Sequence, residues 1–260
     1  MKKLLLAATS MTVLSLSVPA SAADMAARPY TKAPVAPVVA VYNWSGFYVG
    51  GHIGWGWGEI HNTSAAPGTV AFPTGTPFNR TNSDGFLGGV QGGFNWQYNS
   101  LVLGIEGEYT WSDIKGTSTT TSIVAPAVVT TSTAHTDDIA MVTGRVGWAA
   151  NEWLFYGKGG WAWGHGHSNG LVTVAGAPFS NTSTSNNRDG WVVGAGVEWG
   201  FAPNWSAKVE YNHIDFGSNI ITVNQTVGAA TFVDSSTKID LVKAGVNYRF
   251  NWGGPGVTRY

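Results

Sequence analysis

The residues best suited to chemistry are two glutamates, Glu106 and Glu108, which alternate with glycine and apolar side chains in a strand-like segment. Alternate residues of a strand point to the same face, so the two carboxylates would lie together, as general acid–base catalysis requires. The same alternation turns five basic and two further acidic side chains toward the same interior: Arg145, Lys158, Glu198, Lys208, Glu210, Lys243 and Arg249. Four acids facing five bases predict a salt-bridged plug. An ion pathway and a catalytic carboxylate pair are the alternatives.

The histidines are the second group of candidate residues. Within the His165-Gly166-His167 sequence the two imidazoles have i, i+2 spacing, which would place both rings on one side of a strand, where they could ligate haem iron or a transition metal. A lipid hydrolase would need His167 beside Ser168, but adjacent strand residues point to opposite faces, which is poor catalytic geometry. His52 is the one histidine expected inside. The others fall near one rim: His61, His135, His165, His167 and His213.

The elements that must position these residues are strands. From Phe47 to Trp57 every odd position is apolar or glycine, which indicates a strand with two different faces. A soluble β-sandwich would show a polar outward face, whereas here the second face is mostly glycine with isolated charges. We therefore predict an all-β fold, an eight-stranded antiparallel transmembrane β-barrel. Its strands are expected at 46–57, 84–97, 101–112, 137–149, 153–164, 189–201, 205–216 and 238–250.

The connections between these segments alternate in length. Tight turns are expected at 97–100, 149–152 and 202–204, whereas long connections rich in Thr, Ser, Asn and Gly separate the other strands. Short periplasmic turns and long extracellular loops are the rule for outer-membrane barrels. The four extracellular loops are expected at 58–83, 113–136, 165–188 and 217–237.

The tryptophans predict the same orientation. If the first strand runs outward, the aromatic residues fall into two belts, as expected at the two membrane interfaces. The periplasmic belt would hold Trp44, Phe47, Trp96, Trp148, Trp153, Trp199, Trp205 and Trp252. The outer belt would hold Trp55, Trp57, Trp111, Trp161, Trp163 and Trp191.

The beginning of the chain predicts export. Two lysines precede an apolar run from Leu4 to Val18 and an Ala20-Ser21-Ala22 cleavage site, the pattern of a secretory signal peptide. We predict a signal peptide at 1–22, a periplasmic Ala/Pro-rich linker at 23–43 and the barrel at 44–260. The chain has no cysteine for a disulfide or a lipid anchor. Removing Lys2 and Lys3 from 14 basic residues leaves 12 against 15 acidic ones, a net charge of −3 that argues against a nucleic-acid partner.

Three motifs carry a resemblance to a known family. The sequences Tyr42–Gly51, Tyr156–Ala162 and Lys243–Phe250 resemble the small outer-membrane immunogenic proteins of alphaproteobacteria, of the rhizobial type. The resemblance implies an abundant barrel in the cell outer membrane with exposed antigenic loops, and some family members are described as hemin-binding. Val246, Tyr248 and Phe250 look like the alternating, aromatic-ended signal read by the barrel assembly machinery, although Tyr260 is an alternative terminus. The same residues also suit a periplasmic aromatic girdle.

These observations predict a non-enzymatic structural protein that contributes to envelope integrity and surface interactions. A small-solute or ion porin is the first alternative, and a hemin-binding surface protein, with His165 and His167 as ligands, is the second. No other cofactor is expected. The expected partners are outer-membrane lipid and lipopolysaccharide, and the expected state is a monomer.

Overall fold

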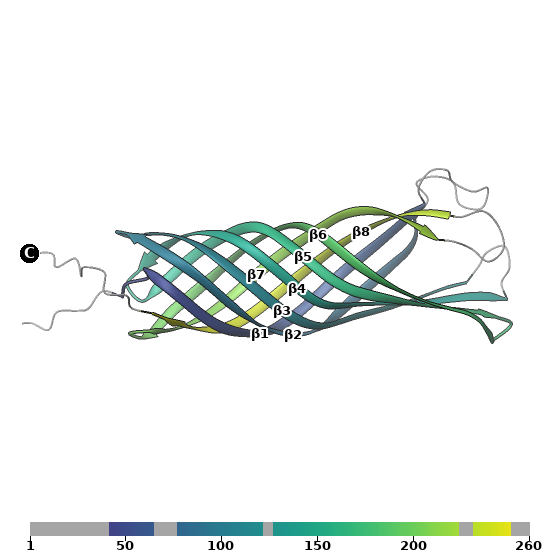
Figure 1. Ribbon diagram of the computed structural model, residues 1–260, viewed down its shortest axis with the longest axis horizontal. Helices are drawn as coiled ribbons and strands as arrows, with labels where there is room; N and C mark the ends of the chain where they lie inside the picture. The colour runs from purple at the N-terminus through teal and green to yellow at the C-terminus, as the bar shows by residue number, and fades with distance from the viewer. Residues whose placement is uncertain (1–41, 65–76, 122–126, 224–230, 251–260) are drawn as a thin grey trace, which may run out of the picture. The chain divides into compact units, whose positions relative to one another are not determined.

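The computed structural model shows one closed antiparallel β-barrel and describes residues 42–64, 77–121, 127–223 and 231–250 (Figure 1). Each strand pairs with the next in sequence, and β1 also pairs with β8, which closes the ring. The predicted eight-stranded barrel is confirmed. The predicted signal peptide, the linker up to residue 41, Trp252 and Tyr260 lie outside the described residues. The strands are β1 (Gly46–Ser64), β2 (Pro77–Tyr98), β3 (Leu101–Thr121), β4 (Val128–Ala150), β5 (Trp153–Val174), β6 (Ala177–Ala202), β7 (Trp205–Val223) and β8 (Thr231–Arg249). Among the described residues, no helix is long and apolar enough to span a membrane.

The two faces of each strand follow the alternation in the sequence. In β1, Phe47 and Ile53 expose 52% and 60% of their surface on the outside of the barrel, whereas Tyr48 and His52 are buried inside. Aliphatic and aromatic side chains cover the outer face because it contacts hydrocarbon rather than water. The inner face is narrow, since the interior of an eight-stranded barrel is just wide enough for side chains to fill.

The three short turns lie where the sequence predicts them. Asn99 and Asn151 adopt φ angles of 53° and 55°, in the left-handed region that asparagine tolerates better than most residues. Pro203 and Asn204 form the third turn, in which the Asn204 side chain donates a hydrogen bond to the Arg249 carbonyl oxygen at 2.8 Å. These turns place the ends of neighbouring strands at the periplasmic end of the barrel.

The long-loop prediction is wrong where the structure describes those residues. The segment predicted as a loop at 165–188 is a continuous β-hairpin, in which β5 and β6 pair as far as Val174 and Ala177 across the turn residues Ala175 and Gly176. The other three predicted loops likewise begin and end as extended strand, in 58–64, 77–83, 113–121, 128–136, 217–223 and 231–237.

The composition of these extensions explains the error. Threonine-rich runs suit solvated loops, but threonine also favours strands and forms cross-strand pairs. Thr117 and Thr133 approach to 3.3 Å through their hydroxyl oxygens, and Thr119 and Thr131 to 3.5 Å. The antiparallel ladder therefore continues past the apolar band, with many polar side chains on it.

Candidate functional site

A group of three glutamates and three lysines fills the middle of the lumen. Lys158 Nζ lies 2.8 Å from Glu108 Oε2, 2.7 Å from Glu210 Oε1 and 3.1 Å from Glu106 Oε1. Lys208 and Lys243 complete the group. Lys208 Nζ lies 3.2 Å from Glu106 Oε2, and Lys243 Nζ lies 2.9 Å from Glu108 Oε2 and 3.1 Å from Glu210 Oε1. All six charged ends are inaccessible to solvent, so each relies on its partners rather than on water.

Arg145 and Glu198 extend this group toward the periplasmic end. The Arg145 guanidinium donates to Glu198 Oε2 at 3.3 Å and lies 3.7 Å from Glu106 Oε2. Ser206 and Asn247 donate hydrogen bonds to the other Glu198 oxygen, Oε1. We call the eight residues Glu106, Glu108, Arg145, Lys158, Glu198, Lys208, Glu210 and Lys243 the charge layer. It contains four acids and four bases, so it carries no net charge.

Two tyrosines hold the Arg145 side chain between their rings. The guanidinium carbon lies 4.9 Å from the centroid of Tyr48 and 4.9 Å from that of Tyr156. Their hydroxyls donate to carboxylates on opposite sides, Tyr48 to Glu106 Oε2 and Tyr156 to Glu210 Oε2, each at 2.8 Å. The tyrosines therefore satisfy carboxylate oxygens and supply a cation–π contact at once.

Glycines facing these tyrosines make the arrangement possible. A Cβ atom at Gly93 would lie 2.4 Å from the Tyr48 hydroxyl oxygen, and one at Gly196 would lie 2.6 Å from the Tyr156 ring. Any larger residue at either position would push a ring out of its place beside Arg145. Inward glycines thus let large side chains cross a narrow lumen.

The ninth predicted member, Arg249, lies apart from the charge layer. Its guanidinium carbon lies 4.3 Å from the Tyr42 ring centroid and 5.6 Å from that of Trp44, and Nη2 donates to the Pro203 carbonyl oxygen at 3.1 Å. Within the described residues it forms no ion pair with a carboxylate. The prediction that all nine charges form one network is therefore wrong for Arg249.

The aromatic residues that contact Arg249, in place of carboxylates, come from the segment before β1. Tyr42 and Trp44 enter the periplasmic end of the lumen and pack with Val102, Ala149 and Leu154. Trp44 exposes only 1% of its surface, so its predicted place in the lipid-facing periplasmic belt is wrong, and Tyr42, predicted as linker, belongs to the barrel interior. Periodicity did not reveal this because these residues precede the first strand. The aromatic layer is defined as Tyr42, Trp44, Val102, Ala149, Leu154 and Tyr156.

An apolar layer closes the lumen on the other side of the charge layer. Phe216 reaches across to β5, where its ring occupies the space that a Cβ atom at Gly164 would need, 2.9 Å away. Sequence reasoning did not identify this layer, although its side chains have the same parity as the inward charges. For example, Ile139 and Met141 alternate with outward residues in β4, as Arg145 does. The apolar layer consists of Leu87, Ile114, Ile139, Met141, Ala162, Val192, Ile214, Phe216, Ile239 and Leu241.

The charge layer is unsuited to metal binding or acid–base catalysis. Glu106, Glu108 and Glu210 each offer an oxygen within 4.8 Å of the others, which is close enough to share a cation. The lysine ammonium groups already lie among these oxygens, so their positive charges take the place that a metal ion would need. Buried layers cover the carboxylates from both ends, and a general acid or base requires access to a substrate.

His52 lies in the lumen, beside the charge layer. Its ring nitrogens lie 2.7 Å from Gln91 Oε1 and 3.0 Å from Thr110 Oγ1. Gln91 Nε2 in turn donates to Asn247 Oδ1 at 2.7 Å. Both imidazole nitrogens are used in this network, so His52 serves as a packed structural residue.

The rim histidines lie on the outer extensions of the barrel. His165 and His167 both lie on β5, where His165 Nδ1 contacts Asn187 Oδ1 and His167 Nδ1 lies 2.8 Å from Asp137 Oδ2. The His167 ring stacks on His135, with centroids 4.6 Å apart. Ser168 instead accepts a hydrogen bond from Asn186 Nδ2 at 3.3 Å. His165 and His167 thus have separate protein partners at their Nδ1 atoms.

The lipid-facing surface ends in a belt of tryptophans paired with aspartates. Trp57 lies directly opposite both Asp84 and Asp240, and the same pairing recurs around the barrel. On a barrel's lipid face an Arg or Lys costs about 2–4 kcal/mol at the midplane, Asp and Glu cost less, and any charge costs much less near the interface, so these aspartates mark the outer edge of the apolar band. The remaining pairs are Trp111 with Asp138, Trp163 with Asp189 and Trp191 with Asp215.

The end of β8 contributes to the periplasmic edge of the same surface. Val246 and Phe250 are 42% and 40% exposed on the outside, and Tyr248 lies between Trp205 and Phe250, with ring centroids 5.0 and 5.2 Å away. The Phe250 backbone N–H donates to the Phe47 carbonyl oxygen at 2.8 Å. These outward side chains continue the periplasmic row of exposed aromatics that includes Trp96, Trp148, Trp153, Trp199 and Trp205.

Comparison with known proteins agrees with this architecture. Residues 8–250 match the family model described as outer membrane protein beta-barrel domain. The 31 kDa outer-membrane immunogenic protein of Brucella melitensis is 32% identical over 223 residues, covering 84% of this chain and 88% of the relative. The 22 kDa outer membrane protein of Rhizobium leguminosarum bv. viciae is 26% identical, covering 79% and 80%. Among solved structures, the outer membrane protease OmpT from Escherichia coli aligns with a TM-score of 0.50 at 8% identity, covering 79% of this chain and 97% of that one, a likeness of fold alone.

Proposed function

This chain belongs to the outer membrane protein β-barrel family and is an outer-membrane protein, and from that premise we propose that it is a closed structural barrel that supports the envelope and presents β-hairpins to the exterior. The observation that carries this proposal is the filling of the lumen by three successive layers. Along the axis lie the aromatic layer, the charge layer and the apolar layer.

The three layers favour this function over that of a porin. A water-filled channel needs a continuous polar path, and porins obtain it with 16 or more strands. Here the polar charge layer is neutral, desolvated and covered on the outer side by ten buried apolar residues. An ion crossing this barrel would have to displace side chains such as Phe216 and Trp44, both almost fully buried.

The outer surface supports the proposed surface role. The hairpin of β5 and β6 continues well beyond the Trp163–Asp189 pair and ends at Ala175 and Gly176, whose φ angles are 49° and 81°. Hydrogen-bonded strands hold such a hairpin more rigidly than an irregular loop. We propose that these extensions form the contact surface, that the tryptophan–aspartate belt contacts outer-membrane lipid and lipopolysaccharide, and that the barrel acts as a monomer.

A liposome-swelling assay tests the closed state against small-solute transport. Vesicles that contain the purified barrel are expected to swell in an isotonic pentose solution no faster than protein-free vesicles. An open porin reconstituted at the same protein-to-lipid ratio provides the positive control. Swelling that increases in proportion to the amount of barrel would contradict the proposal and favour a small-solute porin.

A further inference from the structure

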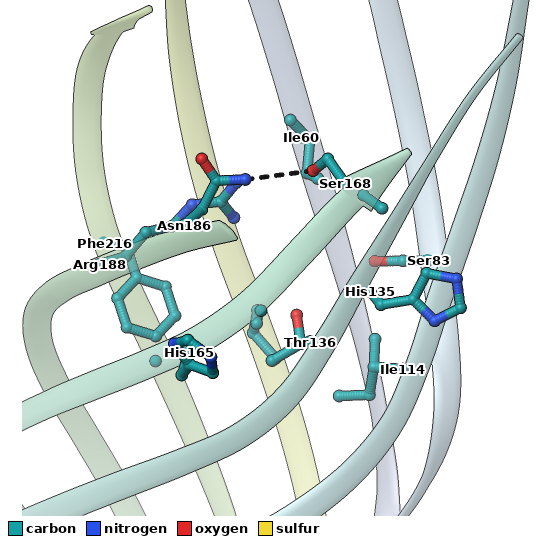
Figure 2. A pocket seen from close by; sticks show the side chains of 14 residues that line it. Ile60, Ser83, Ile114, His135, Thr136, His165, Ser168, Asn186, Arg188 and Phe216 are labelled. Atoms are coloured by element: carbon teal, nitrogen blue, oxygen red, sulfur yellow. Dashed lines mark hydrogen bonds between the residues drawn. The ribbon is translucent and has the colours of Figure 1, made fainter. Parts of the chain in front are cut away.

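The outer mouth of the lumen contains a small polar vestibule above the apolar layer (Figure 2). Phe216 and Ile239 belong to the apolar layer and also line this space, which has a volume of about 20 Å³. Its walls carry polar groups from several strands. They include Ser83 on β2, Thr136 on β4, Ser168 on β5, and Asn186 and Arg188 on β6.

Arg188 is the distinctive residue of this vestibule. It is half-buried, and its inward direction follows from its position two residues before the buried Gly190 and four before the buried Val192. None of the 14 described residues that line the vestibule is acidic. Among the described residues, no carboxylate forms an ion pair with Arg188, in contrast to Arg80, which pairs with Glu59 at the same end of the barrel.

The carboxylates of the charge layer are already paired with bases. The four acids of the charge layer lie beneath the apolar layer and are matched there by four bases. The nearest acid in sequence, Asp189, alternates to the opposite face and lies beside Trp163 in the outer belt. A partly buried guanidinium without a protein counter-charge is costly, and an anion that reaches it gains a charge-assisted interaction.

We propose that this vestibule binds an oxyanion group of a small solute from the exterior, with Arg188 as the main ligand. The planar guanidinium suits a carboxylate, phosphate or sulfate because it donates two parallel hydrogen bonds. Asn186 lies two residues along the same face of β6, and its side-chain nitrogen donates a hydrogen bond to Ser168 Oγ on the neighbouring strand β5. The enclosed volume of about 20 Å³ is small, so it suits the oxygens that contact Arg188, while the rest of the anion would lie in the open outer mouth. Binding here requires no passage through the layers below.

Sulfate is the probe for the first test, with the full barrel in a maltoside detergent that contains no phosphate. The NMR resonances of the Arg188 Nε–H group and of the Gly164 and Asn186 amides are followed as sulfate replaces chloride at constant ionic strength. We expect saturable shifts at these three positions. The same titration with a methyl phosphate ester and with acetate establishes which oxyanion class binds most tightly.

Substitutions identify the ligand. Arg188→Gln is expected to weaken sulfate binding at least tenfold. Arg188→Lys is expected to weaken it less, because lysine keeps the positive charge but loses the planar pair of N–H donors. Arg80→Gln removes an arginine from the outside of the same end and is expected to leave the titration unchanged. Retained gel mobility of unheated samples verifies that each variant is folded. Shifts that never saturate in the wild-type barrel, or equal saturation in Arg188→Gln, would overturn the proposal.

Discussion

Replacing Lys243 with methionine is expected to lower the free energy of unfolding by about 3–5 kcal/mol, the cost of removing one partner from a buried ion pair. Lys243 Nζ contacts Glu108 and Glu210, and all three charged ends are inaccessible to solvent. Methionine fills a similar volume without supplying a charge. The loss of stability therefore measures the cost of a buried carboxylate that has lost its counter-charge, rather than the cost of a cavity. Urea unfolding in lipid vesicles, followed by gel mobility of unheated samples, measures the effect.

The matched control removes a neutral pair. In the double variant Glu108→Met with Lys243→Met, three acids and three bases remain in the charge layer, so its balance is restored. The double variant is expected to be more stable than Lys243→Met alone, because replacing a buried pair with apolar side chains is often nearly neutral. Additive losses from the two single substitutions would show that the groups do not compensate each other.

The second large effect is expected from Trp44→Ala, with a loss of about 3–5 kcal/mol, as for other buried tryptophans truncated to alanine. Trp44 is 1% exposed, contacts Tyr42 with ring centroids 4.6 Å apart, and donates its backbone N–H to Gln97 Oε1 at 2.7 Å. The substitution would leave a cavity in the aromatic layer. The same unfolding assay measures the loss.

Trp96→Ala is the control for this substitution. Trp96 lies at the same end of the barrel but exposes 55% of its surface on the outside, so lipid can fill the space that it leaves. We expect a clearly smaller loss of stability for Trp96→Ala than for Trp44→Ala. Equal losses would place Trp44 in the lipid-facing belt, as the sequence pattern alone suggested.

Strand parity accounts for much of what could be predicted. It identified the alternation of faces, and it directed residues such as Glu108, Lys158 and Lys208 to the interior, where the structure places them in contact. Strand parity predicts side-chain direction well here, because one face of each strand contacts hydrocarbon and the other faces a narrow lumen. A side chain that suits one face is therefore disfavoured on the other.

Other features of the lumen and of the outer strands could not be predicted from the alternation of residues along a strand. Tyr42 and Trp44 enter the lumen from outside the strand pattern, and their presence determines that Arg249 meets aromatic rings rather than carboxylates. The outer strand extensions carry apolar side chains such as Leu171, Val174 and Phe179 without a regular alternation, so alternating hydrophobicity could not distinguish them from loops. Asp137 gives a further example, because the register of β4 and β5 shifts there and a pattern of fixed period does not detect such a bulge.

The central claim, a lumen closed by three layers, is tested most directly by the conductance of the purified wild-type barrel in a planar lipid bilayer at neutral pH. Folded protein, verified by the altered gel mobility of the unheated sample, is expected to insert without producing reproducible current steps, because the aromatic, charge and apolar layers leave no continuous water path. Steady, uniform steps whose number rises with the amount of folded protein would contradict this account and identify the barrel as an ion-conducting porin.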